Sequence, residues 1–199
     1  VSWRFEGLRL LPVVLRLHGA LAAQGRSAKL VFPDAGAAAL ACRDAPQLAD
    51  TIADFAAERR RLQAAAGDPE AVLLAVAPGQ ADYDAFEQLC SNHPGAVVMV
   101  NGRLEDAAVG IGSVARERRR GFLAQWQVAY ELQPLDGAAL RRCFPDAWCL
   151  YREDNDGFRS VAQFEQRPDG EQQAAALASE GSLGSNLRQV DAFLEGLRH

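Results

Sequence analysis

The residues best suited to chemistry in this chain are polar side chains that directly follow short apolar segments. Continuous apolar runs are typical of strands covered on both faces. In open parallel sheets, ligands bind beyond the carboxyl ends of such strands. If the strands are neighbours, the side chains that follow them converge on one edge, which could be a small pocket or a docking edge for a partner. The side chains concerned are Asp34, Gln80, Asn101 and Arg103.

The same residues also have a purely structural interpretation. Asp34 can cap the helix that follows it, since its side chain can accept from a free backbone N–H. Arg103 can pair with Glu105, Asp106 or Asp34 and so help to fix the polar loop that begins at Asn101. Both interpretations stay open at this point, and Glu105 and Asp106 join the candidate set as members of that loop.

A second candidate surface is rich in arginine. Arg116, Arg119 and Arg120 share one face at helical spacing. One interpretation is a solvated face that Glu117 neutralises in part. The other is a basic spot for an acidic partner or for anionic lipid headgroups.

Other motifs do not complete a catalytic site. Gly110-x-Gly112 resembles a phosphate-binding loop, but it follows a polar loop rather than a strand end. Cys90-x-x-His93 lacks the second ligand pair of a zinc site, and no serine lies in a G-x-S-x-G context. We predict no catalytic residue, no metal and no cofactor, so the sequence disfavours an enzyme without excluding one.

The composition bounds the class of protein. A chain of 199 residues with 49% apolar and 24% charged residues is typical of one soluble globular domain, here residues 1–199. The net charge of −5 disfavours nucleic-acid binding. No apolar run approaches the ~20 residues of a membrane-spanning helix. The cysteines lack a C-x-x-C pair and no signal peptide is apparent, which predicts a cytoplasmic protein with reduced thiols, those of Cys90 and Cys149 buried.

Hydrophobic periodicity predicts an α/β fold. The first half alternates strands and helices, which indicates parallel strands joined by crossovers. The second half predicts an antiparallel extension, so the whole is a single domain with one mixed, mostly parallel sheet flanked by helices. The predicted strands are Val1–Glu6, Lys29–Phe32, Ala71–Val76, Ala96–Val100, Gln125–Leu132, Ala147–Arg152 and Phe158–Glu165. We expect Lys29–Phe32, Ala71–Val76 and Ala96–Val100 to be central and mutually parallel, Asp136–Cys143 to be a short helix, and Leu187–Leu197 to be a closing helix.

Two long strings carry a family resemblance, FPDAGAAALA at Phe32–Ala41 and NGRLEDAAVGIG at Asn101–Gly112. Together with Trp148 and the string at Tyr151–Asp154, the chain resembles a domain of unknown function from cyanobacteria and chloroplasts. That family includes the low-photosystem-II-accumulation proteins and a domain appended to a chloroplast adenylate kinase. The resemblance extends from about Lys29 to the last helix. Gly102 departs from it, because relatives usually have proline there, and glycine is expected to loosen the loop.

The resemblance implies a function but no residue roles. It implies an assembly or accessory factor for photosynthetic membrane complexes, of the photosystem II type. Such a factor would bind a protein partner, a photosystem subunit or another assembly factor. It would act in the cytoplasm of a cyanobacterium, peripheral to the thylakoid membrane. The alternative is a small-molecule or nucleotide-binding module, or an enzyme, that uses the strand-end edge.

Overall fold

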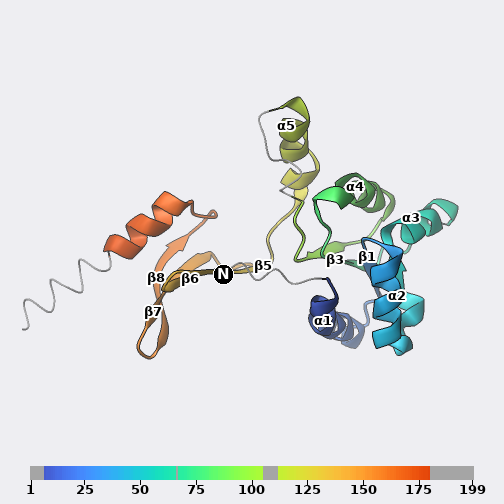
Figure 1. The fold of residues 1–199 in the computed structure, drawn as a ribbon, viewed down its shortest axis with the longest axis horizontal. Coiled ribbons are helices and arrows are strands. Elements are labelled where there is room, and N and C mark those ends of the chain that lie inside the picture. Colours follow the sequence, from blue (N-terminus) through green and yellow to red (C-terminus); the bar gives the residue numbers. More distant parts are fainter. Residues whose placement is uncertain (1–6, 66, 105–111, 180–199) are drawn as a thin grey trace, which may run out of the picture. The chain divides into compact units, whose positions relative to one another are not determined.

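The computed structural model describes residues 7–65, 67–104 and 112–179. Contacts divide the chain into two compact units, a first unit of Arg4–Trp126 and a second that contains Gln127–His199 (Figure 1). The predicted strand Val1–Glu6 and the predicted helix Leu187–Leu197 lie outside the described residues. The single-domain expectation stays a prediction.

The first unit is built on a four-stranded parallel sheet with the order β2-β1-β3-β4. Its strands are β1 (Ala28–Phe32), β2 (Ile52–Asp54), β3 (Val72–Val76) and β4 (Val97–Val100). Parallel pairing of β1 with β3 and of β3 with β4 confirms that part of the prediction. The expectation that all three are central is wrong, because β4 lies at an edge of the sheet. Its apolar run is only partly covered, and Val98 is 40% exposed.

Helices cover both faces of this sheet. Alternate residues of β1 and β3 point to opposite sides, and both sets are apolar, so each face needs a covering layer. Leu30, Phe32 and Leu74 belong to one core and Val31 and Leu73 to the other. The first core includes residues of α1 (Leu11–Ala23) and α2 (Ala35–Asp44), and the second those of α3 (Phe55–Ala64) and α4 (Tyr83–Asn92) (Figure 1). Short 3-10 helices span Gly7–Leu10, Pro46–Thr51 and Gln80–Asp82.

An aromatic cluster ends the first unit. After α5 (Ser113–Arg120) comes a 3-10 helix, Phe122–Gln125. The ring of Phe86 on α4 lies 5.9 Å from that of Phe122 and 5.7 Å from that of Trp126. The predicted strand Gln125–Leu132 therefore begins too early, because Trp126 packs against α4 instead of alternating in a sheet.

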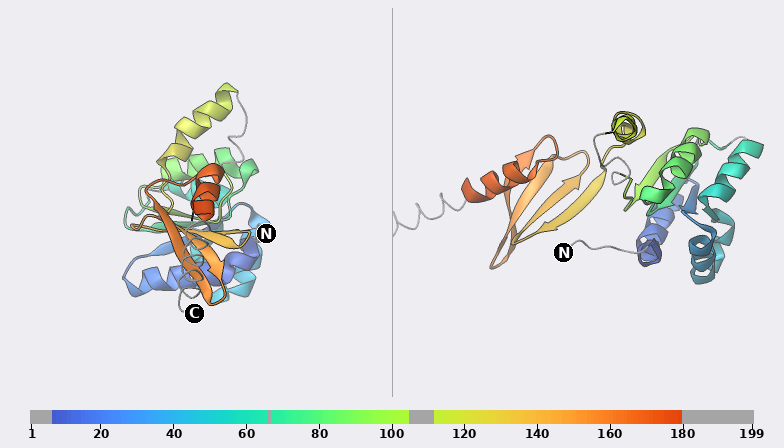
Figure 2. Two further views of the ribbon diagram at one scale, coloured as in Figure 1. Left: turned by 90° about the vertical axis from the view of Figure 1, so that its left-hand side faces the viewer. Right: turned by 45° about the horizontal axis from the view of Figure 1, so that its top comes forward.

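The second unit is a four-stranded antiparallel sheet with the order β5-β6-β7-β8. Its strands are β5 (Tyr130–Leu135), β6 (Ala138–Cys143), β7 (Trp148–Asp154) and β8 (Gly157–Phe164). The helix of residues 170–179 packs on one face, where Ala176 and Leu177 meet a core of Leu140, Trp148 and Leu150 (Figure 2). The α/β class, with a parallel first half and an antiparallel second half, is confirmed. The expectation of one mixed sheet is wrong, because these strands form a sheet of their own.

The predicted helix Asp136–Cys143 is also wrong. Leu135 pairs with Ala138, so Asp136 and Gly137 form a two-residue hairpin turn. Gly137 has φ +59°, the left-handed conformation that such turns require. The hairpin of Ala147–Arg152 and Phe158–Glu165 is confirmed by the pairing of β7 with β8.

Candidate functional site

Polar residues expected from the sequence follow the carboxyl ends of the parallel strands. β1 lies between β2 and β3, so the chain leaves β1 towards one side for β2 and later enters β3 on the other. In open α/β sheets this reversal marks the crevice in which ligands bind. Asp34 follows β1, Gln80 follows β3, and Asn101 follows β4 beside it.

The aspartates at this edge hold the beginnings of helices. Oδ1 of Asp34 accepts a 2.9 Å hydrogen bond from the backbone N–H of Ala37 on α2. Asp54 does the same at α3, and Oδ2 of Asp82 accepts from the N–H of Gly79. The structural interpretation of Asp34 as a helix cap is therefore correct. Asp34 is also exposed, so solvent can reach it.

Backbone geometry ties the last two strand ends to each other. Ala77 and Asn101 both adopt left-handed conformations, with φ of +49° and +53°. The Ala77 N–H donates to the carbonyl of Val100, and the Arg103 N–H donates to the carbonyl of Pro78, each at 2.8 Å. Asparagine tolerates this conformation, whereas alanine loses about 1–2 kcal/mol in it. The two loops are thus fixed together.

Gly102 permits a close approach at the same place. A Cβ on this residue would lie 2.3 Å from Sδ of Met99 and 3.1 Å from Cγ of Pro78. The glycine therefore brings its backbone against β4 and the loop after β3, in a segment that hydrogen bonds already hold. Arg103 is half-buried, and its predicted partners Glu105 and Asp106 lie outside the described residues. The third predicted partner, Asp34, caps α2 and forms no ion pair with Arg103 in the described part of the chain.

The predicted arginine face lies on α5 and is exposed. The side chains of Arg116, Arg119 and Arg120 are exposed, whereas Ala115 of the same helix is buried. Arg118 anchors α5 to α4: its guanidinium lies 2.9 Å from the Asp84 carboxylate and 4.3 Å from the centre of the Tyr83 ring. Sequence reasoning left Arg118 out of the candidate set because it falls off the shared face, and this geometry explains its separate role.

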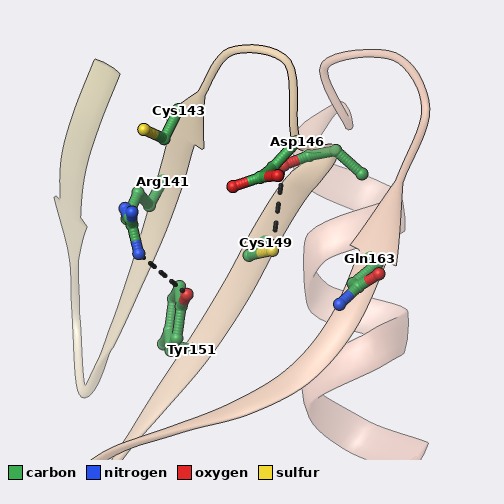
Figure 3. A pocket seen from close by; sticks show the side chains of 7 residues that line it. Arg141, Cys143, Asp146, Cys149, Tyr151 and Gln163 are labelled. Atoms are coloured by element: carbon green, nitrogen blue, oxygen red, sulfur yellow. Dashed lines mark hydrogen bonds between the residues drawn. The ribbon is translucent and has the colours of Figure 1, made fainter. Parts of the chain in front are cut away.

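A cavity of about 260 Å³ lies on the sheet of the second unit, at residues outside the candidate site set predicted from the sequence (Figure 3). Arg141 and Cys143 line it from β6, and Cys149 and Tyr151 line it from β7. Nη1 of Arg141 donates to the Tyr151 hydroxyl at 3.5 Å. Cys149, like Cys90 on α4, is half-buried rather than buried as predicted. The missed signal is the two-residue spacing 141/143 and 149/151, which strands convert into a shared face.

The sequence of the chain matches one known protein family over most of its length. The family described as a domain of unknown function, DUF1995, matches residues 1–175. The chain belongs to the DUF1995 family. No curated protein and no solved structure gives a significant match to it. The DUF1995 match includes the strands of both units, so the cavity and the strand-end edge both lie within the family domain.

Metal ligands do not gather in the described part of this DUF1995 chain. Within residues 7–65, 67–104 and 112–179, no group of three or more His, Cys, Asp or Glu residues could hold a metal ion. His93 is buried and its Nε2 lies 3.1 Å from the carbonyl of Ala71, a structural contact. In the same described segments, no helix is both apolar and long enough to cross a membrane.

One buried carboxylate is fully engaged in ion pairs. Glu58 on α3 is 1% exposed and lies 2.7 Å from Nζ of Lys29 and 2.6 Å from a guanidinium nitrogen of Arg61. Burial alone would raise the pKa of Glu58. The hydrogen bonds from Arg61 and Lys29 outweigh burial and lower this pKa below its usual value. Glu58 therefore stays ionised in the interior of the first unit.

Proposed function

We propose that this chain is a non-enzymatic accessory factor that binds an acidic protein partner through the exposed arginine face of α5. The observation that supports this most is the arrangement of the four arginines on the helix. Arg118 faces α4 and is engaged by Asp84 and Tyr83, while Arg116, Arg119 and Arg120 are exposed. Anchoring by Arg118 holds the helix that presents the other three guanidinium groups.

The chemistry of arginine suits this task. A guanidinium group is planar and always charged, and its fork of donors matches carboxylates. Three of them on one helical face attract an acidic surface over a distance that salt limits to about 8 Å at physiological ionic strength. The chain as a whole is acidic, with a net charge of −5, so this face is a local exception to its charge.

The biological setting rests on the resemblance to the low-photosystem-II-accumulation proteins. On that basis the partner is a photosystem subunit or another assembly factor of a photosynthetic membrane complex. The chain would act on the cytoplasmic side of the thylakoid membrane of a cyanobacterium, as a peripheral protein without catalytic activity.

The test is binding of the purified chain to thylakoid membranes. The variant R116E/R119E/R120E should fold normally, because exposed substitutions change stability by about 0.5 kcal/mol or less. It should lose most membrane association, and wild-type association should weaken as salt rises. The matched control R9E/R16E/R60E changes three other exposed arginines of the first unit and the same amount of charge, and it should bind like the wild type.

Two further arms separate a protein partner from a lipid surface. Thylakoid membranes shaved with protease should lose the binding, and protein-free vesicles of the anionic thylakoid lipids should not restore it. Equal recovery of the wild type and the α5 variant at low salt would remove the arginine face from the mechanism. Full binding to the protein-free vesicles would reject a protein partner.

A second candidate function is favoured by the strand order. The reversal at β1 and β3 is the place where small ligands bind in related architectures, and Asp34 and Asn101 lie at its edge. Under this hypothesis a small molecule or nucleotide raises the melting temperature of the chain. Asp34→Ser keeps a capping side chain but removes the charge, so it separates ligand binding from the structural role of Asp34. A ligand-induced shift that persists in both Asp34→Ser and Asn101→Ala would reject this edge as the site.

A further inference from the structure

The cavity on the second sheet combines two thiols with an arginine on one face. In an antiparallel pair, residues opposite each other share a face. Arg141 pairs with Cys149, and the next residues along each strand, Leu140 and Leu150, belong to the core beneath. Cys143 therefore lies on the same face as Arg141, on the side of the sheet away from that core (Figure 3).

Arg141 has only uncharged partners in the described part of the chain. The pKa of Arg141 is raised, first by its hydrogen bond with the Cys143 thiol and then by its hydrogen bond with the Tyr151 hydroxyl. No carboxylate among residues 7–65, 67–104 and 112–179 forms an ion pair with it. Uncharged partners hold a guanidinium less strongly than a carboxylate does, so an anionic ligand can replace them.

The two thiols are poorly placed to bridge to each other. Both are free, and both are half-buried at the cavity. Cys149 opposes Arg141 in the last residue pair of β6 and β7, and Cys143 lies two residues further along β6. In a regular ladder, residues in this diagonal relation have Cα atoms about 7–8 Å apart. A disulfide usually requires Cα atoms within about 7 Å. Each thiol is therefore left for an external partner.

We infer that this cavity is a modification site at which Cys143 forms a mixed disulfide with a small anionic disulfide of the oxidised-glutathione type. The Cys143 sulfur, as the thiolate, attacks one sulfur of the reagent. The reagent's S–S bond breaks, and its electron pair leaves with the second half as a thiolate, which takes up a proton from solvent. Cys143 is oxidised to the mixed disulfide, and one half of the reagent is reduced to a free thiol.

Arg141 and Gln163 have tasks in this exchange, and the Asp146 carboxylate also lines the cavity. Arg141 attracts the carboxylates of the reagent and lies beside the sulfur that carries negative charge. The amide of Gln163 lines the same cavity and can hydrogen-bond the reagent's peptide groups. The cavity volume of about 260 Å³ leaves room for one arm of such a reagent.

The other cysteines supply controls within the same chain. Burial raises the pKa of Cys90 to about 12, which makes its thiol unreactive near neutral pH. Cys42 is half-buried on α2, and the neighbouring Arg43 is already paired with Asp44. Cys149 lines the cavity, but its thiol is directed to the carbonyl of Ala147 at 3.7 Å.

The experiment compares two disulfides on the full reduced chain. Oxidised glutathione is anionic and 2-hydroxyethyl disulfide is neutral, and peptide mass spectrometry gives the modification rate at each cysteine. Oxidised glutathione should modify Cys143 about tenfold faster than Cys42, since a charged cleft raises encounter rates by at least that factor. Cys90 should be slowest. Equal rates at Cys143 and Cys42 with oxidised glutathione would overturn the inference.

Variants at Arg141 isolate the charge. Arg141→Gln should slow modification of Cys143 by oxidised glutathione about tenfold and leave the rate with the neutral reagent nearly unchanged. Arg141→Lys should restore most of the rate, and Arg60→Gln, at an exposed position of the first unit, should have no effect. A loss that is equal for both reagents would contradict the role of Arg141.

The wild type alone also decides the question. If Arg141→Gln does not fold, the preference of wild-type Cys143 for the anionic reagent should shrink as sodium chloride rises towards 1 M. A preference that salt does not change would overturn the inference. The site does not depend on the function proposed for α5.

Discussion

Glu58 is a residue whose contribution to the free energy of unfolding can be predicted from its ion pairs. The carboxylate is buried between Lys29 and Arg61. Glu58→Gln should lower the free energy of unfolding by about 2–4 kcal/mol, because a partly buried ammonium then loses its counter-charge. Urea unfolding measures this change. The control Glu117→Gln, exposed on α5, should stay within about 0.5 kcal/mol of the wild type.

The same residue predicts how stability depends on pH. The pKa of Glu58 is lowered in the folded state, so its contribution is fully present above the unfolded pKa of about 4.3. That contribution is lost as pH falls through the folded pKa. The difference in unfolding free energy between the wild type and Glu58→Gln should be constant near pH 7 and should shrink below about pH 4.3. A difference that stays constant through the acidic range would contradict this assignment.

Ala77 carries backbone strain that a single substitution can remove. Its φ of +49° suits glycine better than alanine. Ala77→Gly should therefore stabilise the chain by about 0.5–1 kcal/mol, measured by thermal or urea unfolding. The same substitution at Ala53, within β2, should destabilise it, because extended alanine gains nothing from glycine. Destabilisation at both positions would mean that Ala77 is not strained.

Among the elements, α5 is joined to α4 by contacts of Arg118 with Asp84 and Tyr83. Exposed ion pairs contribute about 0–1 kcal/mol and cation–π contacts about 0.5–1 kcal/mol, so the Arg118 anchor is modest in energy. Arg118→Ala should leave global stability within about 1 kcal/mol and accelerate hydrogen exchange of the α5 amides. Binding to thylakoid membranes should weaken as well. Unchanged exchange in Ser113–Arg120 would show that other contacts hold the helix.

The sequence predicted the elements whose signals are local, and it missed one element whose signal was outweighed. The parallel strands were predictable because β1 and β3 are short apolar runs followed by turn residues, and Asp34 was a recognisable cap. β6 was missed although Asp136-Gly137 is a strong hairpin signal. The assumption of a helix at 136–143 outweighed that signal and hid the shared face of Arg141 and Cys143.

The division into two sheets could not be read from periodicity. Strand alternation shows which residues face a core, but it does not say which core. Trp126 is an example, because it fits a strand pattern and in fact stacks on Phe86. The anchoring of α5 likewise depends on Arg118 and Asp84, which are far apart in sequence and meet only through packing.

At the scale of the whole molecule, the two units should differ in stability. Among the described residues, the two cores of the first unit contain 12 and 10 buried residues, whereas the core of the second unit contains three, Leu140, Trp148 and Leu150. Hydrogen exchange should therefore be slowest in β1 and β3 and measurably faster in β5–β8. Equal protection in both sheets would instead support the single domain expected from the sequence.

The position of β4 affects how the protein behaves in concentrated solution. Among the described strands it pairs only with β3, and its four residues carry neither charge nor proline, the features by which edge strands resist joining other chains. We expect copies that are warmed or stored at high concentration to associate first along this strand and to form β-rich aggregates. Val98→Lys, at a position 40% exposed, should delay the turbidity of a warmed sample and change the melting temperature little.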